Sequence, residues 1–88
     1  MKINENYILK TIAGSPVVVP VGDAVSNING MITLNGPGET IWKALEAGKD
    51  FDGVLATLNA EYDAPEELLK KDLTAFLEKM RKYNILED

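Results

Sequence analysis

The charged residues of this 88-residue chain are distributed so unevenly that its two parts are expected to fold differently. Residues 1–34 contain four charged side chains, whereas residues 35–88 contain the other nineteen. The first part is rich in β-branched residues and turn residues, which is typical of short strands. The second part repeats apolar residues at helical spacing. The sequence therefore predicts a sheet followed by helices.

The first part predicts three strands in an antiparallel meander, over residues 7–13, 17–21 and 31–34. Gly14-Ser15-Pro16 has turn chemistry, and a loop from Gly22 to Gly30 precedes the third strand. Pro20 cannot donate a ladder hydrogen bond, so it is expected near a strand end or a bulge. In a simple meander the second strand is central, and the first and third are edges.

The second part predicts three helices, over residues 38–47, 51–61 and 65–83. Asn35 and Asp50 suit the caps of the first two helices, and Asp63 with Glu66 resembles a capping box for the third. We expect one α+β domain over residues 1–88, with a three-stranded antiparallel sheet followed by three helices. The last two helices and the small sheet resemble a winged helix-turn-helix arrangement.

The residue inventory argues against catalysis. The chain contains no histidine and no cysteine, so the commonest general base and the usual zinc ligands are missing. The acidic pairs Asp50/Asp52 and Glu66/Glu67 stand at predicted helix starts, where the helix dipole favours them. We therefore expect no enzymatic activity, no catalytic or metal-binding residue and no cofactor.

Charge and hydropathy restrict the partners. The formal net charge is −5, whereas nucleic-acid-binding proteins usually present a basic patch. No apolar run approaches the ~18 residues of a membrane span, and the first residues lack the pattern of a signal peptide. We expect a cytoplasmic protein with no nucleic acid and no membrane as partner.

The third predicted strand has an unguarded edge. Proteins usually protect edge strands with charges, proline or bulges, and residues 30–35 contain neither a charge nor a proline. One explanation is that a loop or the third helix covers this edge. The other is that it receives an added strand from a partner, which binds through backbone hydrogen bonds.

The third helix has a mixed flank beside its apolar stripe. A helical projection places Leu68, Asp72, Ala75, Lys79 and Tyr83 on this flank, next to Phe76 of the stripe. A solvated flank needs no Leu68 or Tyr83, whereas a groove that holds a peptide does. Alternatively, Leu68 and Tyr83 pack on the loop or on the chain's tail, since single exposed apolar residues are common.

Several short motifs together resemble the PqqD-like family of small peptide-recognition domains. They are Val17-Val18-Val19-Pro20, Met31-Ile32-Thr33-Leu34-Asn35, Gly38 with Ile41-Trp42 and Leu45, Tyr62-Asp63, Phe76-Leu77 and Tyr83-Asn84-Ile85-Leu86. They cover the chain from about Tyr7 to Leu86. The resemblance implies a peptide chaperone that binds the leader segment of a ribosomally made precursor peptide. It also implies presentation of that peptide to a modifying enzyme, often a radical S-adenosylmethionine (SAM) enzyme.

In this family the leader adds as a strand to the third strand and lies against the third helix. On this chain the resemblance and the helical projection together give a peptide-binding set, which is Gly30, Met31, Ile32, Thr33, Leu34, Leu68, Asp72, Ala75, Phe76, Lys79 and Tyr83. Two alternatives remain open. One is a DNA-binding winged helix, and the other is a regulatory module that forms a homodimer or larger oligomer through the same edge.

Overall fold

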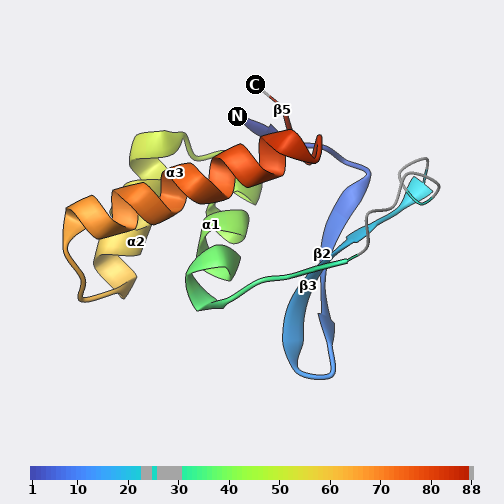
Figure 1. Cartoon of the computed structure of the whole chain (residues 1–88), viewed down its shortest axis with the longest axis horizontal. Helices are drawn as coiled ribbons and strands as arrows, with labels where there is room; N and C mark the ends of the chain where they lie inside the picture. The colour runs from blue at the N-terminus through green and yellow to red at the C-terminus, as the bar shows by residue number, and fades with distance from the viewer. Residues whose placement is uncertain (23–24, 26–30, 88) are drawn as a thin grey trace.

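The computed structural model of the chain describes residues 1–22, Val25 and residues 31–87. The elements in chain order are β1 (Lys2–Ile3), β2 (Tyr7–Ile12), β3 (Ser15–Pro20), β4 (Ile32–Thr33), α1 (Gly36–Glu46), α2 (Phe51–Glu61), α3 (Glu66–Lys82) and β5 (Leu86–Glu87). Figure 1 shows the helices gathered on one side and the β2–β3 hairpin projecting on the other. The prediction of a three-stranded antiparallel sheet followed by three helices is confirmed.

The sheet has the strand order β2-β3-β4, so β3 is central, as the meander predicts. The hairpin turn lies one residue earlier than the sequence indicates, because Ala13 and Gly14 both have positive φ angles, 51° and 82°. Two such residues form the tight turn whose twist matches the flanking strands. Ser15 and Pro16 therefore belong to β3 rather than to the turn.

Two of the three expected helix caps are present. The Asn35 side chain accepts a hydrogen bond from the Gly38 backbone N–H at 2.8 Å, and Asp50 accepts one from Gly53 at 2.9 Å. The expected Asp63 cap is wrong, since α3 begins at Glu66 and its cap residue is Pro65, with no side-chain hydrogen bond. The residue before a proline favours extended backbone, so the helix starts after Pro65, too far along for Asp63 to cap it.

A second, two-stranded sheet is absent from the sequence prediction. β1 pairs antiparallel with β5, with Lys2 opposite Glu87 and Ile3 opposite Leu86. Each strand has two residues, which is too short for a periodic signal. The pairing brings the two ends of the chain together beside the C-terminal end of α3 (Figure 1).

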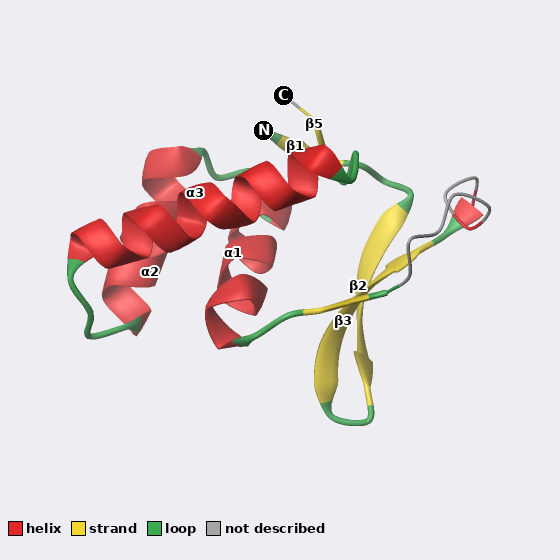
Figure 2. Cartoon of the chain, viewed as in Figure 1, coloured by secondary structure: helices red, strands yellow, loops and turns green. Residues whose placement is uncertain are grey.

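The hydrophobic core lies mainly between the helices and includes one face of the sheet. Figure 2 shows the arrangement of these helices and strands. The α3 residues that it contains are Leu69, Leu73, Leu77 and Met80, and Phe76 packs against it at the margin. Trp42 of α1 and Val18 of β3 are each only 1% exposed. No helix in the described part of the chain is long and apolar enough to cross a lipid bilayer.

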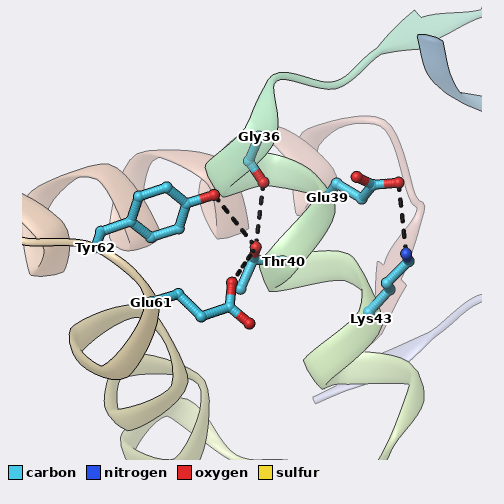
Figure 3. Close-up of polar contacts among 6 residues, drawn as sticks. All are labelled: Gly36, Glu39, Thr40, Lys43, Glu61 and Tyr62. Atoms are coloured by element: carbon cyan, nitrogen blue, oxygen red, sulfur yellow. Dashed lines mark hydrogen bonds and ion pairs between the residues drawn. The ribbon is translucent and has the colours of Figure 1, made fainter. Parts of the chain in front are cut away.

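The first turn of α1 is attached to the end of α2 by a polar cluster (Figure 3). The Thr40 hydroxyl lies 2.8 Å from Glu61 Oε2, 3.2 Å from the Gly36 carbonyl oxygen and 3.4 Å from the Tyr62 hydroxyl. Glu39 and Lys43 form an exposed ion pair at 3.6 Å on the same helix. The Thr40 cluster holds the start of α1, and therefore also the end of β4 shortly before it.

Gly38 and Gly53 provide a matched test of this corner, since each is the third residue of a helix capped by the residue three before it. A Cβ at Gly38 would lie 3.0 Å from Asn35 Oδ1 and 3.4 Å from Leu34 and Phe76 atoms. We expect Gly38→Ala to lower the free energy of unfolding by about 1–2 kcal/mol, through a weakened cap and crowding. Urea titration measures this change.

Gly53→Ala is the control. Its new Cβ would lie 3.1 Å from Lys49 Cβ and 3.3 Å from Asp50 Oδ1, but both of these residues are exposed, whereas Leu34 and Phe76 pack in or against the core. Alanine is the better helix former by about 1 kcal/mol. We expect Gly53→Ala to change the unfolding free energy by less than half as much as Gly38→Ala. Equal losses in the two variants would contradict the crowding at the β4–α1 corner.

Candidate functional site

The edge of β4 that faces away from β3 has no strand beside it in the described part of the chain. β4 pairs only with β3, with Val17 opposite Thr33 and Val18 opposite Ile32. The strand is shorter than expected, since only Ile32 and Thr33 of residues 31–34 have strand geometry. The hydrogen bond from the Leu34 N–H to the Pro16 carbonyl, at 2.9 Å, nevertheless continues the pairing by one residue.

This last hydrogen bond fixes the direction of the backbone groups along the whole segment. In an antiparallel ladder the N–H and C=O of one residue point to the same side, and successive residues alternate. Leu34 and Ile32 therefore point their backbone groups toward β3. Thr33 points its backbone groups to the open edge, where no strand of the described residues pairs with them.

The end of this edge meets α3 at an apolar corner. Gly38 lies between Leu34 and Phe76, since a Cβ on it would be 3.4 Å from a side-chain atom of each. Leu34 is buried at 7% exposure, whereas Phe76 is half-buried and packs against the core. The absence of a side chain at Gly38 thus lets β4, α1 and α3 approach one another at one point.

The predicted flank of α3 is only partly an apolar surface. Leu68 is 49% exposed, Asp72, Ala75 and Lys79 are also exposed, and Tyr83 packs against the core. Neither Asp72 nor Lys79 forms an ion pair within the residues that the structure describes. The flank therefore presents one free carboxylate and one free ammonium group about two helical turns apart.

The structure brings together some of the predicted residues but not all. Leu34 and Phe76 meet at Gly38, and Ile32 and Tyr83 both pack against the core cluster. Leu68 lies more than two turns before Phe76 on α3, far along the helix from this corner. Gly30 lies outside the described residues.

Sequence reasoning identified the open edge but not which backbone groups it exposes. That distinction depends on the register between β3 and β4, which is set by where the loop before Met31 ends. The hydrophobic pattern of residues 31–34 places Ile32 and Leu34 on the core side. It does not say which residue of β3 lies opposite each of them.

Comparisons with known proteins identify the family of this chain and a solved structure of similar fold. No curated protein sequence matches the chain. The solved structure of TbiB1 in complex with the TbiA(beta) leader peptide is similar in fold, with a TM-score of 0.82 and 25% sequence identity. The match covers 99% of this chain and 95% of that chain. A family model described as coenzyme PQQ synthesis protein D (PqqD) matches residues 17–86, and the chain therefore belongs to the PqqD family.

Proposed function

We propose that this protein binds the leader segment of a ribosomally made precursor peptide as an additional strand on β4. The observation that carries the proposal is the open edge of β4 at Thr33, whose backbone N–H and C=O groups point away from β3. It is supported by membership of the PqqD family and by the similarity to TbiB1, a protein solved in complex with a leader peptide.

Strand addition suits this edge because the backbone supplies most of the contacts. A peptide paired with Thr33 would make hydrogen bonds that do not depend on its sequence. Specificity would come from alternate side chains of the peptide, which point to the α3 side of the sheet. There they would meet the apolar corner at Leu34 and Phe76.

The charges on α3 supply further selectivity. Lys79 is exposed and would pair with an acidic residue of the leader, whereas Asp72 would pair with a basic one. Such exposed pairs contribute less than about 1 kcal/mol each, so they choose between leaders more than they provide affinity.

The bound leader would hold the rest of the precursor near an enzyme that modifies it. This tethering raises the effective concentration of the modifiable segment without any new contact to it. The family resemblance implies a modifying enzyme that is often of the radical SAM class. The expectation that the complex forms in the cytoplasm comes from the sequence pattern instead. The protein would then be a binding adaptor, and the enzyme would carry out the chemistry.

Thr33→Pro tests strand addition directly. Proline removes the N–H that faces the open edge, and leaves the Ile32 and Leu34 hydrogen bonds to β3 in place. We expect about five- to tenfold weaker binding, the value of one backbone hydrogen bond with some added steric cost. The measurement is calorimetric titration with synthetic peptides from the short open reading frames found beside this chain's gene.

Thr33→Val is the matched control, because it keeps the backbone N–H and the β-branched shape. We expect its affinity for the same peptide to stay within about twofold of the original, and thermal unfolding to show that both variants are folded. Equal affinities of Thr33→Pro and Thr33→Val would overturn strand addition at this edge.

The charges on α3 can be tested with two charge reversals. Lys79→Glu lies on the predicted flank, and Lys70→Glu makes the same change on the opposite side of the helix. For a leader with an acidic residue toward α3, we expect Lys79→Glu to weaken binding about threefold at low salt, with the loss fading as salt rises. Lys70→Glu should have no such effect, and equal losses would show that only the net charge matters.

A further inference from the structure

Two charged residues of α3, Asp72 and Lys79, lack the opposite charge that every other charged residue of this helix has nearby. Side chains three or four positions apart are neighbours on a helix. The positions at this distance from Asp72 hold only apolar residues, and those from Lys79 hold no acidic residue. The other charged residues of α3 each have an opposite charge at this spacing, and they are Glu66, Glu67, Lys70, Lys71, Glu78, Arg81 and Lys82. Because Asp72 and Lys79 also form no ion pair with another element in the described part of the chain, both are available to a ligand.

Asp72 and Lys79 lie on one strip of the helix surface together with Phe76. At 3.6 residues per turn they are rotated by about 40° and 60° from Phe76, both to the same side of it. Asp72 comes about 6 Å before Phe76 along the helix axis, and Lys79 about 4.5 Å after it. We call these three residues the charged strip. Its middle member is the α3 residue that meets Gly38 at the β4 corner.

β4 runs in the opposite direction to α3. The end of β4 lies beside Phe76, at the Gly38 corner. Its start lies toward the end of β3, where Pro20 pairs with Tyr7. Three residues before Tyr7, the Asn4 N–H donates a hydrogen bond of 2.7 Å to the carbonyl of Ile85, just after α3. The start of β4 is therefore the end nearer to the C-terminal end of α3, as the opposite chain directions of the two segments in Figure 1 also show.

An added strand would bring its alternate side chains to the three residues of the charged strip. Every pair in the β2-β3-β4 sheet is antiparallel, and an antiparallel strand on β4 would run in the same direction as α3. Its residue opposite Thr33 would point to the outer side of the sheet, and the residues next to it would point to the α3 side. Two residues of a strand span about 6.7 Å, which is close to the spacing within the strip.

The register assigns one peptide residue to each member of the strip. The residue opposite Leu34 lies at the apolar corner with Phe76. The residue two positions after it is opposite Ile32 and lies toward Lys79. The residue two positions before it lies toward Asp72. The long lysine side chain covers the remaining difference of a few ångströms between the strand spacing and the helix spacing.

We propose that this site selects leaders in which a basic, an apolar and an acidic residue stand at alternate positions, in this order from the N-terminal side. The inference rests on the proposed function, since it names the class of leader that the β4 edge accepts. The basic residue pairs with Asp72, the apolar residue packs on Phe76, and the acidic residue pairs with Lys79. A leader with the two charges in the opposite order would place like charges together at both positions, which weakens binding.

The test exchanges the charges on both partners. The chain variant is the double substitution Asp72→Lys with Lys79→Glu. The probes are the synthetic peptide, from the short open reading frames beside this chain's gene, that binds the original chain, and the same peptide with its basic and acidic residues exchanged. We expect either exchange alone to weaken binding about tenfold at low salt, and both together to restore the affinity to within about twofold. Calorimetric titration measures the four affinities.

The double substitution Lys71→Glu with Glu78→Lys is the matched control. It also exchanges two opposite charges seven residues apart on α3 and leaves the net charge unchanged. Both positions are exposed, but they are rotated by about 140° and 160° from Phe76, on the side of the helix away from the strip. We expect it to bind each peptide within about twofold of the original chain, and thermal unfolding to show that both double variants are folded.

Four outcomes would overturn the proposal. One is a bound peptide that has no basic, apolar and acidic residues at alternate positions in this order. The second is an unchanged affinity of the Asp72→Lys, Lys79→Glu chain for the original peptide. The third is a loss with either exchange that the two together do not restore. The fourth is an equal loss in the control variant. Failure of every such peptide to bind the original chain would instead contradict the proposed function.

Discussion

The junction between β4 and α1 is the constraint on which the rest of the structure depends. Leu34 ends the pairing with β3, Asn35 caps the helix, and Gly38 leaves room for Phe76 of α3, all within five residues. The cap is worth only about 1 kcal/mol. Its larger effect is geometric, because it fixes the angle at which a short strand leaves the sheet. That angle decides whether the open edge faces α3, and so whether the edge and the helix can act as one site.

The order and type of the main elements could be predicted because each had a strong local signal. The valine run of residues 17–19 gave the central strand, and the Leu69, Leu73, Leu77 repeat gave α3. The errors occurred where a tertiary effect decides. Ala13 adopts a positive φ that its sequence does not favour, because the hairpin register requires it. The β1–β5 pair joins residues more than eighty positions apart, and no local pattern reports such a contact.

The site was predictable to a different degree in its two halves. The edge followed from strand order and from the missing charge in residues 31–34, both of which are readable in the sequence. The α3 residues of the site were predicted from a helical projection. It gives the angular position of each residue around the helix, but not which stretch of the helix lies beside β4. Leu68 and Phe76 therefore looked equivalent, although only Phe76 reaches the β4 corner. The position of each α3 residue along the helix, relative to β4, depends on how α3 packs on α2 and the rest of the core, and not on the flank itself.

The pairing of β1 with β5 has a consequence for how such a domain can be joined to other proteins. In an antiparallel pair, opposite Cα atoms are only about 5 Å apart, so the chain enters and leaves the domain at nearly the same point. A domain with adjacent ends can be inserted into a surface loop of a larger protein without stretching either one. A second protein fused at the first residue or at the last would also lie at nearly the same distance from the sheet. The fold is thus suited both to separate existence and to incorporation as a module.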